Sequence, residues 1–373
     1  MNADLLCERL FDSADPVSML FELASIVGPS LMLGKFSELA GQSSADQKKQ
    51  YEDLRVLARQ KVWLPVAAER EVGQWMDQKY RKESLVIEPS DLPRNQRSRF
   101  DLAKGVLDGV IATLPTDSPY KFTLSVAQAD ESNASISPGG FMYVTTGMLQ
   151  DKTLERDDFA LRLSHEVAHL TRRHALKEIQ IKAVDTVEIT KSIKPLLDFT
   201  KEPARGMEAL FGSMKASDLM FQRFGQLQEL EGDACGAYLL VRQTGVDARA
   251  AITRFATSRA GTGDGKGWES SHPAPEEREL VMTAQLDPAA RARVAQLRGA
   301  GAPAPAVAAG GRPANSASQA PRNEPSPAGL PPISAGIQPS AGTSPVGSLL
   351  DKIRKSLPAG TSDAAPAQQR SAP

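Results

Sequence analysis

The stretch Ser164-His165-Glu166-Val167-Ala168-His169 decides how this chain of 373 residues folds, because it carries the pattern H-E-x-x-H within a predicted helix. On a helix, His165 and His169 lie about 40° apart and one turn from each other, so both imidazoles can bind one metal ion. Glu166 lies beside that ion, where its carboxylate can hold a water molecule and act as a general base. The pattern therefore predicts a helix built around a metal site.

A zinc ion in a hydrolytic site needs three protein ligands and one position open to water, so a third ligand is required. His174 lies too far around the same predicted helix and is expected to face away, as a solvated or supporting histidine. A second predicted helix carries Glu229-Leu230-Glu231-Gly232-Asp233. Glu229 and Asp233 share one face of it, so we expect Glu229 to bind the metal and Asp233 to accept the N–H of a ligand histidine. Glu231 points elsewhere.

The periodicity around these helices predicts an α+β domain that is mostly helical and contains a small antiparallel sheet. Period-two alternation over 120–126 and 141–145 indicates two short strands, with a turn between them at Asn133-Ala134 and residues 137–140. Apolar residues at helical spacing predict the other elements. These helices are expected over 46–60, 67–82, 91–114, 156–182, 205–212, 217–243, 247–258 and 275–286.

Composition divides the chain into three parts. Residues 301–373 hold half of the 26 prolines and no aromatic, cysteine, methionine or histidine residue, so they cannot bury enough apolar surface to fold. We expect a helical N-terminal region over 1–88, a domain with the histidine pair over 89–287, and a disordered Pro/Ala-rich tail over 288–373. A short apolar stripe in the tail is either a docking motif for a partner or a chance pattern. It consists of Leu349, Leu350, Ile353 and Leu357.

The charge balance and the cysteines exclude several classes of protein. With 44 basic and 45 acidic residues and no dense basic cluster, the chain lacks the electrostatic character of a nucleic-acid binder. Cys7 and Cys235 offer neither a disulfide framework nor a C-x-x-C pair, which excludes a small secreted scaffold and a cysteine-rich zinc ribbon. Any metal must therefore be held by histidines and carboxylates.

The most apolar segment, residues 17–36, does not have the pattern of a membrane span. Its charge-free part covers only residues 23–34, and acidic residues precede it where a signal peptide would be basic. We expect a packing helix here, with a helix that lies on a membrane surface or binds a partner as the alternative. The sequence as written thus predicts a cytoplasmic protein without a transmembrane helix. A mis-started N-terminus would instead allow a periplasmic or membrane-associated protein.

Further motifs follow in a fixed order, and together they resemble the zinc metallopeptidases of the CAAX-prenyl-protease, HtpX and BepA type, which are gluzincins. The resemblance covers about residues 90 to 285 and implies a zincin-like metallopeptidase domain for residues 89–287. The matching motifs are, in chain order, Asn133-Ala134 with residues 138–147, His165–His169 with His174, Glu229–Asp233, Gly245-Val246-Asp247, and Ser271-His272-Pro273 followed by Arg278.

The resemblance implies a zinc metalloendopeptidase with one Zn²⁺ per chain. His165, His169 and Glu229 would bind the zinc, Glu166 would be the catalytic residue, and Asp233 would support a ligand. The expected substrates are peptide bonds of unfolded or flexible proteins, in protein quality control.

The same resemblance implies roles on the substrate side. The strand that begins with Pro138-Gly139-Gly140 would border the cleft, where a substrate adds as an extended strand. Asn133, Gly140 and Arg278 would have substrate-side or regulatory roles. His272 would either occupy the water position in a closed form or be a structural histidine in a turn.

Other interpretations fit parts of the pattern. A catalytically inactive, zinc-stabilised scaffold or chaperone-like binding module would keep the same residues, and a zinc hydrolase could act on a non-peptide amide. Arg162 and Ser164, directly before the motif, depart from the apolar residues of the family. Residues 175–216 form either a lid over the cleft or a pair of packing helices.

Overall fold

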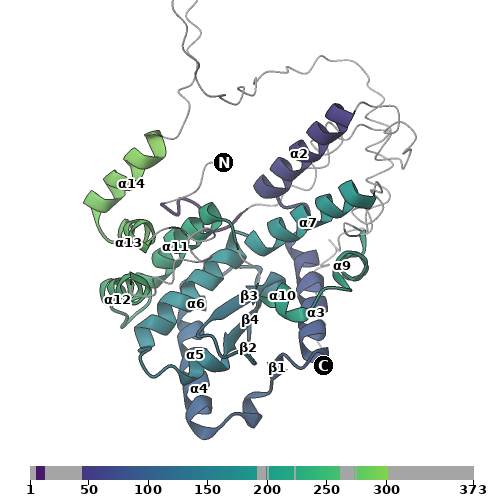
Figure 1. Ribbon diagram of the computed structural model, residues 1–373. Helices are drawn as coiled ribbons and strands as arrows, with labels where there is room; N and C mark the ends of the chain where they lie inside the picture. Colours follow the sequence, from purple (N-terminus) through teal and green to yellow (C-terminus); the bar gives the residue numbers. More distant parts are fainter. Residues whose placement is uncertain are drawn as a thin grey trace, which may run out of the picture. The chain divides into compact units, whose positions relative to one another are not determined.

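The structure, a computed structural model, describes residues 6–12, 44–190, 199, 201–221, 224–260, 273 and 275–300. It confirms a mostly helical α+β fold with a small sheet (Figure 1). The tail, with its apolar stripe, and the apolar segment 17–36 lie outside the described residues. The helices are α2 (Ser44–Gln60), α3 (Val66–Lys82), α4 (Arg94–Ile111), α5 (Thr146–Gln150), α6 (Arg156–Thr171), α7 (His174–Thr190), α9 (Pro203–Phe211), α10 (Ala216–Met220), α11 (Gln226–Leu240), α12 (Ala248–Ala260), α13 (Pro275–Thr283) and α14 (Pro288–Ala300).

The sheet has four strands in the order β1-β2-β4-β3, namely β1 (Val86–Ile87), β2 (Thr123–Ala127), β3 (Ala134–Ser137) and β4 (Phe141–Thr145). The antiparallel sheet predicted from the sequence is wrong in one respect, because β2 and β4 pair in parallel. The reason is β3, which lies in residues that the sequence indicated as a turn. It forms an antiparallel pair with β4, so β4 runs in the same direction as β2.

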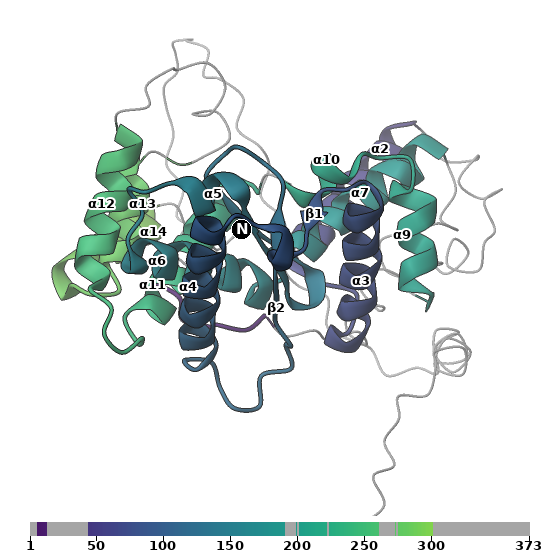
Figure 2. The same ribbon diagram turned by 90° about the horizontal axis from the view of Figure 1, so that it is seen from below.

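Both faces of the sheet are covered, which explains why every residue of β4 is buried. Successive side chains of a strand point to opposite faces. Met142 and Val144 pack into the core beneath α4 and α6, whereas Phe141 and Tyr143 pack into a second core beneath α3. Figure 2 shows α4 and α3 on the two sides of β2. The sheet therefore forms a rigid base for the helices that carry the predicted site.

Two predicted long helices are each divided in two. The predicted helix over 156–182 ends at Thr171 and restarts as α7 at His174, and residues 217–243 form α10 and α11. Between α6 and α7, Arg173 has a φ of 55°, a left-handed conformation that changes the direction of the chain. Its buried guanidinium donates to Glu69 Oε2 of α3 at 3.0 Å and to the Leu64 carbonyl. These partners offset the cost of burying the charge and hold the corner in place.

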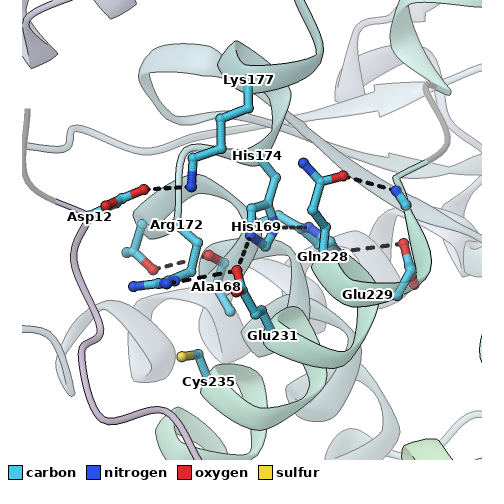
Figure 3. Close-up of polar contacts among 12 residues, drawn as sticks. Asp12, Ala168, His169, Arg172, His174, Lys177, Gln228, Glu229, Glu231 and Cys235 are labelled. Carbon is cyan, nitrogen blue, oxygen red and sulfur yellow. Dashed lines mark hydrogen bonds and ion pairs between the residues drawn. The ribbon is translucent and has the colours of Figure 1, made fainter. Parts of the chain in front are cut away.

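A short N-terminal strap, residues 6–12, lies against the same corner. A disulfide joins Cys7 to Cys235 of α11, although the sequence offered no disulfide framework. The Asp12 amide donates to the Thr171 carbonyl at 2.9 Å, and the Asp12 carboxylate pairs with Lys177 of α7 (Figure 3). The strap thus connects the start of the chain to three helices of the centre, α6, α7 and α11.

Two other features bear on the predicted organisation. Among the described residues, none of the helices has the length and apolar character that a membrane span requires. α14 is helical through Ala300 and buries Val294, so regular structure continues into the first residues of the predicted tail.

Candidate metal centre

Helix α6 presents His165, Glu166 and His169 because it is fixed at its start and along its buried face. At its N-terminus, Asp158 Oδ2 accepts from the Glu155 amide at 2.8 Å, which satisfies one backbone donor at the start of the helix. The opposite face buries apolar side chains completely, which fixes the rotation of the helix. These fully buried residues include Phe159, Leu163 and Val167.

Helix α11 runs beside α6, and two glycines make the close approach possible (Figure 1). A Cβ at Gly236 would lie 2.8 Å from His165 Cα, and one at Gly232 would lie 2.9 Å from His169 Nε2. Only a hydrogen at these positions lets the backbone of α11 lie this near the histidines. The Gly232-x-x-x-Gly236 spacing in the sequence is the signal that could have predicted this contact.

The three predicted ligands converge. His165 Nε2 and His169 Nε2 lie 2.9 Å apart, and the Glu229 carboxylate lies 3.7 Å from the former and 3.8 Å from the latter. Zinc bonds of about 2.1 Å in a tetrahedral site separate ligand atoms by about 3.4 Å. The distances to the carboxylate lie near this value and the nitrogen–nitrogen distance lies below it. Two imidazole nitrogens and a carboxylate in one place fit zinc by their chemistry.

His165 is held from behind by a buried carboxylate. Asp233 Oδ1 lies 3.0 Å from His165 Nδ1, and Arg278 of α13 binds both Asp233 oxygens at 2.7 Å. Burial alone would raise the pKa of Asp233, but the Arg278 guanidinium and His165 lower it to about 2. Asp233 therefore stays ionised and leaves His165 Nε2 free to face the metal position. The sequence did not predict that Arg278 binds Asp233.

His169 is held differently, and here the expectation of a solvated His174 was wrong, whereas the alternative of a supporting histidine agrees with the structure. His174, expected to face away, is fully buried with its Nδ1 2.7 Å from His169 Nδ1. The turn at Arg173 is the reason, because His174 would face away only if one helix ran without interruption from 156 to 182. His174 Nε2 in turn contacts Glu231 Oε2 at 3.0 Å. Burial lowers the pKa of both His169 and His174, so both imidazoles are neutral.

The site opens into a cavity of about 280 Å³. Glu166 faces this cavity, and burial raises the pKa of its carboxyl to about 7. The strand along the cavity is β3, an edge strand, rather than the predicted β4, which is interior. Apolar side chains line the wall formed by α3, α10 and the residues before α11. They are Met76, Leu219, Met220, Phe221 and Phe224.

Only some of the remaining predicted site residues lie at the cavity. Asn133 and Arg278 line the cavity, whereas Gly140 does not; its φ of 92° and its approach to the Lys121 carbonyl give it a role in the turn before β4. His272 lies outside the described residues. Phe224, which the sequence did not single out, stacks on His169 with ring centroids 4.1 Å apart.

The two residues that depart from the expected apolar pattern have defined partners. Ser164 is buried and accepts from Gln243 at 2.9 Å, and Arg162 donates to the Ser132 carbonyl at 3.0 Å while lining the cavity. Residues 175–216 contain α7 and α9, and α9 packs against α3. Their described parts therefore form packing helices.

Known proteins resemble this chain in the region that carries the candidate metal centre. Residues 101–283 match Peptidase family M48, and all three candidate ligands lie within the match. The chain is 26% identical over 197 residues to Metalloendopeptidase OMA1, mitochondrial, of Bos taurus, which covers 50% of this chain and 37% of that protein. The chain thus spans little more than a third of this relative. The resemblance inferred from the sequence is confirmed: the match of residues 101–283 to Peptidase family M48 and the similarity to this relative support a zinc metallopeptidase of this type.

Proposed function

We propose that this protein is a zinc-dependent metalloendopeptidase that hydrolyses peptide bonds in unfolded or flexible protein segments. The observation that carries the proposal is the convergence of His165, His169 and Glu229 beside Glu166, at the wall of a cavity along which β3 runs as the edge strand of the described sheet. His165, His169 and Glu229 would bind the zinc. When bound, zinc supplies a Lewis acid that polarises a carbonyl and makes water more acidic.

Glu166 performs the proton transfers in this proposal. Its carboxylate faces the cavity, where it accepts a proton from the attacking water and then delivers it to the nitrogen of the departing amine. One carboxylate thus serves both steps, and the peptide bond is cleaved with one water consumed. Asp233 and Arg278 keep His165 in the tautomer that presents Nε2 to the metal.

The cavity supports an extended, partly apolar substrate. A peptide that pairs its backbone with the edge strand β3 would cross the metal position while its side chains meet the apolar wall. A folded domain cannot offer such a strand without local opening, so unfolded segments are the favoured substrates. This substrate class supports a role in protein quality control.

The catalytic unit is proposed to cover residues 89–287, with a contribution from the region before it. Met76 of α3 lines the cavity, and Glu69 of α3 holds the Arg173 corner. The N-terminal helices thus complete the site and do not form an independent unit.

The disulfide bears on the compartment. Cys7–Cys235 needs oxidising conditions to persist, which favours a disulfide-permissive compartment over the cytoplasm expected from the sequence. Because both cysteines are buried, thiol labelling of the unfolded protein, with and without reductant, tests this point. Labelling without prior reduction would contradict it.

The test of the proposed function is Glu166→Gln with zinc content and casein cleavage measured together. We expect the variant to keep zinc and to lose about two or more orders of magnitude in cleavage rate, because its amide cannot accept the proton. Glu88→Gln, at an exposed ion pair with Arg81, is the matched control and should retain full activity. Unchanged cleavage by Glu166→Gln would refute the role of Glu166. A zinc-loaded wild type without cleavage would favour the binding-module alternative.

A further inference from the structure

The support behind His169 is a continuous chain of polar contacts between buried side chains. His169 Nδ1 lies 2.7 Å from His174 Nδ1, and His174 Nε2 lies 3.0 Å from Glu231 Oε2 (Figure 3). His169 and His174 are at most 1% exposed, and Glu231 is 9% exposed. Water therefore has little access to the two Nδ1 atoms that face each other. These atoms must find their hydrogen-bond partners within the protein.

This geometry fixes the position of each proton. His169 Nε2 faces His165 and Glu229, so a metal bound there leaves the proton of His169 on Nδ1. Nδ1 then donates to His174 Nδ1, which must be unprotonated to accept. The proton of neutral His174 consequently lies on Nε2, where it donates to Glu231. Reversing either tautomer would place two protons or two lone pairs face to face.

We infer that His174 and Glu231 are positioning residues that orient His169 for the metal, with the carboxylate acting through an intervening imidazole. This inference rests on the proposed function, since it takes His169 as a ligand. His165 reaches its carboxylate directly at Asp233, whereas His169 reaches Glu231 through a second histidine. A carboxylate behind a ligand histidine raises its basicity and fixes its ring, and His174 transmits both effects.

The strap, residues 6–12, supports the Glu231 end of this series of contacts. Arg172 Nη2 lies 3.7 Å from Glu231 Oε2, and Arg172 Nη1 donates to the Arg9 carbonyl at 3.1 Å. Lys177, one turn after His174 on α7, pairs with Asp12. The strap therefore contacts both Arg172, which lies beside Glu231, and Lys177, which follows His174 on α7 (Figure 3).

The first test determines the tautomers in the zinc-loaded wild type by ¹⁵N NMR of the imidazoles. With four histidines in the whole chain, single substitutions suffice to assign the signals. We expect His169 protonated on Nδ1 and His174 on Nε2. A His174 protonated on Nδ1 would overturn the inference.

The second test measures zinc affinity by competition with a chelator. We expect His174→Leu to weaken zinc binding by about 10- to 100-fold, the effect of losing an outer partner of a ligand histidine. His174→Asn, whose side-chain carbonyl can still accept from His169, should recover most of that loss, as a merely space-filling role would not predict. Equal affinities for wild type and His174→Leu would refute the positioning role while leaving the metal site intact. A wild type that binds no zinc would refute the metal site and this inference together.

Discussion

The two histidines of the motif lie one turn apart on α6, yet they are held by different parts of the molecule. His165 borders the cavity, and its support comes from α11 and α13 through Asp233 and Arg278. His169 is fully buried, and its support comes from α7 and α11 through His174 and Glu231. One metal position thus depends on two separate polar networks. Each network can therefore be weakened by itself, and zinc affinity reports on both.

The largest effect is expected on the His165 side. Asp233→Ala removes the partner of a buried guanidinium, so we predict a loss of about 3–5 kcal/mol in the free energy of unfolding. Arg278 already lies 3.5 Å from Glu229 and would then compete with zinc for that carboxylate. Urea unfolding and zinc stoichiometry measure the two effects. Glu88→Gln, at an exposed ion pair, should cost less than about 1 kcal/mol. Similar losses for both variants would contradict the assignment.

The strap is expected to affect the His169 side next. Cys7→Ser removes the disulfide that fixes residues 6–12 beside Arg172, and we predict a loss of about 2–4 kcal/mol in the free energy of unfolding. Zinc affinity should fall less than in His174→Leu, because Glu231 and His174 keep their direct contact. The reductant dithiothreitol should destabilise the wild type by a similar amount and leave Cys7→Ser unchanged. A wild type insensitive to reductant would show that the strap does not stabilise the site.

The smallest effect is expected where both networks meet, at the contact between α6 and α11. Gly236→Ala places a methyl group against the backbone of His165, and we predict a cost of about 1–3 kcal/mol together with weaker zinc binding. Gly105→Ala in α4 is the control, because nothing lies within 4 Å of the added carbon. There the better helix propensity should stabilise the protein by about 1 kcal/mol. Equal behaviour of the two variants would show that the helices do not need the glycine.

Much of the fold could be predicted from local pattern alone. Helical periodicity located α2 and α3 to within about two residues, and alternation gave the bounds of β4. β3 was missed because Ala-Ser-Ile-Ser is short and pairs only through its contact with β4, which no local pattern reveals. Because β3 was missed, the parallel pairing of β2 and β4 was missed as well.

The site likewise has a part that could be predicted from the sequence and a part that could not. Spacing on two helices was enough to predict that His165, His169 and Glu229 could meet. The place of His174 could not be predicted, because it depends on the left-handed turn at Arg173, whose buried charge needs a partner on the distant helix α3. The disulfide and the strap likewise join residues far apart in the sequence.

A crystal structure of the zinc-loaded protein, with an anomalous difference map at the zinc absorption edge, tests the central claim most directly. The account predicts one peak, about 2.0–2.2 Å from His165 Nε2, His169 Nε2 and a Glu229 carboxylate oxygen. A zinc peak on other residues, or a peak that leaves Glu229 outside bonding distance, would contradict it.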